Sequence, residues 1–123
     1  MTCTLLRAGQ TPAAVRAEWL FNSANPFAVT LSLTNKPVDW MIGRELLATG
    51  LWCPVGDGDV RIEPMLGDLL LIELRSPSGH ALLLLDAAEA RRALDLSYAS
   101  VPLGTETRAT DLDAELAAIC DHP

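Results

Sequence analysis

Short runs of alternating apolar and polar residues, each ended by turn residues, constrain the fold of this chain more than any other feature. The clearest run follows the turn-forming residues 22–26 and reads Phe27-Ala28-Val29-Thr30-Leu31-Ser32-Leu33-Thr34. A period of two places alternate side chains on opposite faces, as in a half-buried β-strand. The sequence therefore predicts a strand over 27–34 in an antiparallel sheet.

Five further segments also predict strands, three by alternation and the last two as apolar, extended runs, and they are separated by turn residues rich in Pro, Asn, Ser and Gly. They predict strands over 15–21, 38–42, 60–63, 69–75 and 80–85, with Pro64 ending the third of these. The segment 44–49 is made of good helix formers, and Gly50 after it suits a left-handed helix end. Residues 53–59 are too rich in Pro, Gly and Asp for regular structure and predict an exposed loop.

Two further helices are expected near the C-terminus. Asp86 followed by Glu89 resembles a capping box, and predicts a helix over 87–98. A second capped segment begins at Thr110 and has an apolar stripe of helical period. The element order is typical of an α+β fold, with two three-stranded meanders, a short helix between them and one or two C-terminal helices.

Length and composition favour one compact domain that spans residues 1–123. The chain is 50% hydrophobic, which supplies enough apolar material for a core. Its longest apolar stretch, Ala81–Leu85, is far shorter than the ~20 residues of a membrane-spanning helix, and its start lacks the order of a secretory signal. We therefore expect a cytoplasmic protein without direct membrane insertion.

Charge and side-chain chemistry argue against several classes of function. The net charge of −7 and a single lysine disfavour a nucleic-acid partner. Three scattered cysteines and two distant histidines provide neither a disulfide framework nor the ligand spacing of a metal site. The segment Gly56–Asp59 lacks the further ligands of a calcium loop. We expect no catalytic residue, no metal and no cofactor.

The tryptophans are the most informative side chains in a chain with 5% aromatic residues. Trp19 and Trp40 fall on the apolar phase of their predicted strands, which favours packing into the core. Trp52 lies between a helix end and a loop. It is either an exposed anchor for a protein partner or a side chain packed under the loop.

Several segments, in the same order along the chain, together resemble the SsgA-like family of sporulation and cell-division regulators in actinobacteria. The resemblance covers about residues 15–120, which we take as the core of a single SsgA-like domain. Its segments are Val15–Trp19, Asn25–Val29, Trp40–Leu47, Gly50–Leu51, Pro54–Arg61, Ser76–Ala81 and Val101–Glu106. The combination is far more specific than any one of them.

The resemblance implies a strongly curved sheet of about six to seven strands, similar to that of the whirly single-stranded nucleic-acid-binding proteins. It implies a non-enzymatic regulator that helps to position or activate septation, in particular sporulation-specific septation. It also implies a homo-oligomer, with a trimer suggested, that is recruited to the division septum. The partner implied is a divisome protein such as the tubulin-like ring protein FtsZ, or an SsgA-like paralogue.

If the protein is such an adaptor, its partner-binding surface is expected around Trp52, with Arg44, Glu45 and Arg61 fixing the partner's register. Each charge also has a simpler interpretation. Arg44 and Glu45 can solvate a short helix, and Arg61 can pair with an acid of a neighbouring strand.

Two functions of other classes remain as alternatives. One is a single-stranded nucleic-acid-binding module, suggested by the whirly-like fold and opposed by the charge. The other is a small hydrolase or transferase that uses His80 with a nearby acid. His80 can equally be a partly exposed histidine at the end of a strand.

Overall fold

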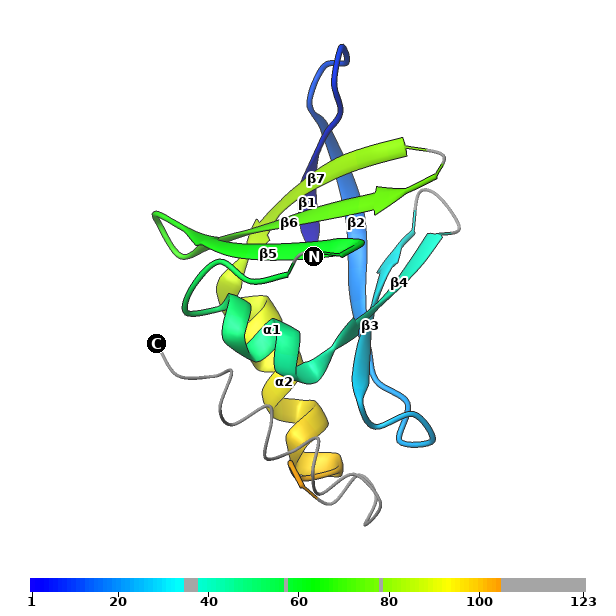
Figure 1. The fold of residues 1–123 in the computed structure, drawn as a ribbon, viewed down its shortest axis with the longest axis vertical. Coiled ribbons are helices and arrows are strands. Elements are labelled where there is room, and N and C mark those ends of the chain that lie inside the picture. The colour runs from blue at the N-terminus through cyan, green and yellow to red at the C-terminus, as the bar shows by residue number, and fades with distance from the viewer. Residues whose placement is uncertain (35–37, 57, 78, 105–123) are drawn as a thin grey trace.

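The computed structural model describes residues 1–34, 38–56, 58–77 and 79–104. These residues form a single seven-stranded antiparallel sheet and two helices (Figure 1). The elements are β1 (Thr2–Leu6), β2 (Ala13–Leu20), β3 (Ala28–Leu33), β4 (Val38–Gly43), α1 (Arg44–Gly50), β5 (Val60–Met65), β6 (Leu69–Ser76), β7 (Gly79–Asp86) and α2 (Ala87–Ser100). The sheet curves until it is nearly closed, with both helices at one end, so the predicted α+β class is confirmed.

The sheet consists of two meanders that are joined by an N-terminal strand. Its order is β4-β3-β2-β1-β7-β6-β5, so β1 lies between the first meander and the second. Thr4 of β1 pairs with Ala14 of β2 on one side and with Leu84 of β7 on the other. The six predicted strands are all present, and β1 is a seventh that was not predicted. Its signal was present, because buried Cys3 and Leu5 alternate with more exposed threonines.

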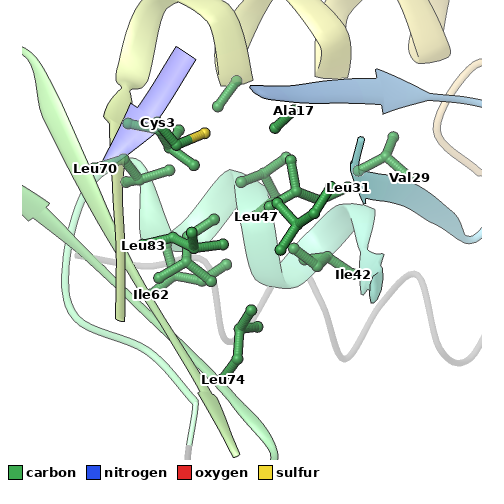
Figure 2. Close-up of a cluster of buried hydrophobic side chains, with 14 of the residues drawn as sticks. Cys3, Ala17, Val29, Leu31, Ile42, Leu47, Ile62, Leu70, Leu74 and Leu83 are labelled. Atoms are coloured by element: carbon green, nitrogen blue, oxygen red, sulfur yellow. The ribbon is translucent and has the colours of Figure 1, made fainter. Parts of the chain in front are cut away.

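The core fills the concave side of the sheet, and α1 brings a leucine into its centre. Figure 2 shows Leu47 of α1 between Leu31 and Ile42 of the first meander and Ile62 and Leu83 of the second. All five are no more than 1% exposed. Apolar burial on this scale is the main favourable term in folding. The two meanders therefore share one core.

Trp19 and Trp40 contribute less to this core than their strand phase suggested. Both are half-buried and pack against the core cluster from its margin. Phe27, predicted to begin the second strand, lies just before β3 and is 41% exposed. The alternation identified the buried face of β3, but a place on the apolar face of a strand does not by itself ensure full burial, as Trp19 and Trp40 show.

Gly50 serves a different purpose from the predicted one. It lies inside α1, and the helix is capped by Leu51 with right-handed φ and ψ of −71° and −16°, so the predicted left-handed helix end is wrong. A Cβ on Gly50 would lie 2.6 Å from Cβ of Ile62. Glycine is needed here because α1 approaches β5 too closely for any side chain.

Pro64 does not end β5, contrary to the prediction. The strand continues to Met65, and Pro64 lies opposite Leu70 of β6. Ile62 exchanges backbone hydrogen bonds of 2.8 and 2.9 Å with Val55, on the side away from β6. The nitrogen of Pro64, two residues on, faces the same way and needs no partner in the ladder. Val55 thus pairs with β5, although the whole segment 53–59 was predicted to be an exposed loop.

Helix α2 begins as predicted. The Asp86 carboxylate accepts a 2.8 Å hydrogen bond from the backbone N–H of Ala88, which is an N-cap interaction. The second C-terminal helix, predicted from Thr110, lies outside the described residues. Neither described helix has the length and apolar character needed to cross a membrane.

Candidate functional site

Arg44, predicted to contact a partner, is buried. Arg44 is only 1% exposed, and it is the first residue of α1, directly after the end of β4. Nη1 donates to the carbonyl of Val101 at 2.7 Å and to the carbonyl of Ser97 at 3.1 Å. The guanidinium carbon also lies 4.5 Å from the ring centre of Tyr98. Both sequence-based interpretations of Arg44 placed it at a surface, and the structure corrects them.

Burial of this cation is explained by what surrounds it. Ser97 and Val101 lie at the C-terminal end of α2, where the carbonyls carry the partial negative charge of the helix dipole. The faces of Phe21 and Tyr98 add electron density at 5.5 and 4.5 Å. Arg44 therefore ties the beginning of α1 to the end of α2, and its charge is compensated inside the fold.

Glu45 and Arg61 are exposed, as a partner contact requires. Glu45 lies in the first turn of α1, where a negative charge is favourable. Arg61 lies on β5, and its Nη1 donates to the carbonyl of Gly56 at 3.4 Å. Glu73, the acid opposite Arg61 on β6, interacts with other side chains instead. The expected ion pair across β5 and β6 is therefore replaced by a contact within the neighbouring loop.

Trp52 is the largest exposed aromatic side chain among the described residues, with 80% of its surface accessible. Its backbone is nevertheless well fixed. Its N–H donates to the carbonyl of Thr49 at 2.9 Å, and the N–H of Cys53 donates to the same carbonyl at 3.0 Å. Of the two sequence-based interpretations, packing under the loop is wrong. The structure presents an indole to solvent on a rigid turn.

His80 has an acidic neighbour that sequence spacing did not reveal. Its Nε2 lies 2.7 Å from Oε2 of Glu73, and Nη2 of Arg75 lies 3.4 Å from the same oxygen. The hydrogen bond from His80, and then the charge and hydrogen bond of Arg75, hold the pKa of Glu73 below its usual value. The register of β6 and β7 brings these three side chains together, because Arg75 lies directly opposite His80.

The structure brings a histidine, an arginine and a carboxylate together at this place on the surface. His80 and Glu73 form an acid–base pair on a partly exposed surface, and Arg75 shares the same carboxylate oxygen. Within the described ranges, no three His, Cys, Asp or Glu side chains come together to hold a metal ion. What the described surface offers is recognition groups: an exposed indole, a glutamate and an arginine.

Comparison with known proteins identifies the family. Residues 15–106 match the family described as the Streptomyces sporulation and cell division protein SsgA. The sporulation-specific cell division protein SsgB of Streptomyces coelicolor is 40% identical over 114 residues, which cover 88% of this chain and 80% of that protein. The protein of the same name from Frankia casuarinae is 38% identical over 117 residues, or 90% of this chain and 82% of the relative.

Solved structures agree with this relationship. An SsgA-like sporulation-specific cell division protein from Thermobifida fusca superposes with a TM-score of 0.77 at 31% identity, covering 95% of this chain and 90% of that one. A structure from work on SsgB mutations and longitudinal cell division in S. coelicolor gives the same TM-score at 35% identity, with 86% of each chain covered. The chain described here therefore belongs to the SsgA family of sporulation and cell-division proteins.

Proposed function

We propose that this protein is a non-enzymatic regulator that helps to position or activate sporulation-specific septation by binding a divisome protein, FtsZ or an SsgA-like paralogue. It acts in the cytoplasm as a homotrimer that is recruited to the septum. The names of its relatives support the cell-division role. The observation that supports action by contact is Trp52, because an indole held at 80% exposure on a hydrogen-bonded turn is poorly explained by folding alone.

An exposed tryptophan is well suited to anchor a partner. Tryptophan is enriched among the few interface residues that dominate binding energy, and it loses little conformational entropy when a partner covers it. Because the turn is already fixed by the Thr49 carbonyl, the partner does not have to order it. Glu45 and Arg61, both exposed, provide charges that can set the partner's orientation.

The test combines light scattering with a binding titration. We would measure the mass of the purified protein alone and with FtsZ, and compare wild type with Trp52→Ala. Leu96→Ala is the matched control, since Leu96 is also large, apolar and 65% exposed but lies on α2. We expect a trimer whose mass shifts with FtsZ, and a loss of affinity of about thirtyfold in Trp52→Ala, which corresponds to ~2 kcal/mol.

Other results would contradict the proposal in distinct ways. Equal affinities of wild type and Trp52→Ala would remove Trp52 from the interface. A shift only with labelled single-stranded DNA, lost steeply as salt is added, would instead favour nucleic-acid binding. If no mass shift is seen with FtsZ, the same titration with purified SsgA-like paralogues decides between the two proposed partners.

A further inference from the structure

The two edge strands of the sheet are not equivalent. On β5 the outward backbone groups of Ile62 are paired with Val55, and Pro64 has no N–H to offer. Proline and local covering are the usual ways in which proteins protect a sheet edge from pairing. The edge formed by β5 is therefore closed to a further strand.

The edge formed by β4 has no such protection in the part of the chain that the structure describes. The N–H of Arg44 donates to the carbonyl of Phe27 at 2.8 Å, and the same register continues along β3 and β4. Hydrogen-bonded and non-hydrogen-bonded pairs alternate in an antiparallel ladder, so Ile42 and Trp40 direct their backbone groups toward β3. The backbone N–H and C=O groups of Met41 and Asp39 consequently point away from β3, toward the open side of β4. Met41 is also 58% exposed.

A hollow of about 530 Å³ adjoins this strand at the open end of the sheet. Trp40 of β4 forms one wall, and Leu74 of β6 lies on another. This is the end of the molecule where the β1–β2 and β6–β7 connections lie, away from α1 and α2 (Figure 1). The volume is sufficient for a bulky apolar side chain, and apolar walls with a few polar groups are typical of binding sites.

The charge at the hollow is opposite to that of the protein as a whole. The hollow is lined by Arg7, Gln10 and His80, and the depression that adjoins it is lined by Arg75. Neither the hollow nor the depression has an Asp or Glu among its described lining residues. Among the residues that the structure describes, the carboxylate in contact with these bases is that of Glu73, which His80 and Arg75 already share. In a chain of net charge −7, a rim of this sign favours an anionic occupant.

We propose that β4 and the adjoining hollow are a docking site for an extended acidic segment of a partner protein. The segment adds a strand beside β4 through the backbone groups of Met41 and Asp39. An apolar side chain of the segment enters the hollow beside Trp40, and a carboxylate meets Arg7 and His80. This combines strand addition, which provides affinity, with a side-chain pocket, which provides specificity. This inference rests on the proposed function only because it assumes that the molecule bound at β4 is a protein.

The test selects binders from a random peptide library displayed on phage, with the full-length protein as target. Selected peptides are synthesised and titrated by fluorescence anisotropy against wild type, Met41→Pro and Met41→Ala. Proline removes the outward N–H without removing a bond to β3, whereas alanine retains it. We expect acidic peptides that bind Met41→Pro at least tenfold more weakly than wild type, and Met41→Ala within about threefold.

Charge reversal at the rim is the second arm. Arg7→Glu should weaken the same peptides about tenfold and reduce the salt dependence, whereas Arg92→Glu, the same change on α2, should leave binding unchanged. Amide hydrogen exchange of wild type gives a readout without mutation. The amides of Asp39 and Met41 should exchange faster than those of Trp40 and Ile42, and bound peptide should slow them.

Each other result would overturn the inference. These results are a selection without binders, binders without acidic enrichment, or equal binding to Met41→Pro and Met41→Ala. A lower oligomeric mass of Met41→Pro would show that β4 pairs with a second copy instead. The proposed function fails separately: peptides that dock at β4 while neither FtsZ nor a paralogue binds would refute the proposed partners and retain the docking site. If FtsZ binds Met41→Pro as tightly as wild type, the proposed partner is retained and the docking site at β4 is refuted.

Discussion

Removing the buried cation at Arg44 should cost this protein a large part of its stability. The guanidinium makes two short hydrogen bonds, to the carbonyls of Val101 and Ser97, and contacts two aromatic rings. Hydrogen bonds to a charged group contribute about 1.5–3 kcal/mol each, and a desolvated cation–π contact ~0.5–2 kcal/mol. The lower ends of these ranges already give about 4 kcal/mol for Arg44→Ala. A small domain has only ~5–15 kcal/mol in total.

The assay is urea unfolding followed by tryptophan fluorescence, with Arg61→Ala as the matched control. Arg61 is exposed, and its side chain donates to the Gly56 carbonyl at a long 3.4 Å, so its removal should change the free energy of unfolding by less than ~0.5 kcal/mol. Arg44→Lys keeps the charge but loses the planar fork and the ring stacking, and should fall between the two at about 2 kcal/mol. It also provides a measurable variant if Arg44→Ala does not fold.

One result would refute this reasoning. If Arg44→Ala loses less than ~1 kcal/mol, the link between α1 and α2 does not depend on the guanidinium, and apolar packing alone holds the two helices together. A loss in Arg44→Lys equal to that in Arg44→Ala would contradict the intermediate value expected for the retained charge, and would assign the whole effect to the geometry of the fork.

Two further predictions concern packing and titration. Gly50→Ala should destabilise the protein by about 1–3 kcal/mol in thermal or urea unfolding, because its Cβ would collide with Ile62, whereas Gly79→Ala, with no neighbour within 4 Å, should be close to neutral; similar losses in both would refute the close approach. The pKa of Glu73 lies below its ordinary value of 4.5, so its ionised form stabilises the fold above that pH, and this contribution is lost as pH falls through the lowered pKa. His80→Ala should raise the pKa of Glu73 in an NMR titration of the side-chain carboxyl, and an unchanged value would show that Arg75 alone perturbs it.

The strands could be predicted because their signal is local. A half-buried strand repeats every two residues, and residues 28–33 carry that repeat with buried Val29, Leu31 and Leu33. The five residues of β1 are too few, and too rich in threonine, to stand out in the same way. Pro64 misled the prediction because its effect depends on which strand is an edge, and this is decided by pairings far along the chain.

The candidate site was less predictable, since exposure is a tertiary property. Arg44 and Arg61 are the same residue type, yet one is enclosed by the end of α2 and the other faces solvent. Nothing near Arg44 in the sequence indicates that residues 97–101 will supply its acceptors. Gly50 shows the same limit, because a glycine needed for close approach looks identical to one needed for a helix end.

The central position of β1 determines the order in which this sheet can be completed. Its pairing with β2 closes after a short connection, but its pairing with β7 joins Thr4 to Leu84, 80 positions later. During synthesis, each meander can form its own hairpins before β7 is available, and the edge of β1 that pairs with β7 stays unpaired until then. The long-range closure with β7 costs more loop entropy than any hairpin and gives the topology a slow, late step. The strand that comes first in this sheet along the chain is thus the one whose pairing finishes among the last.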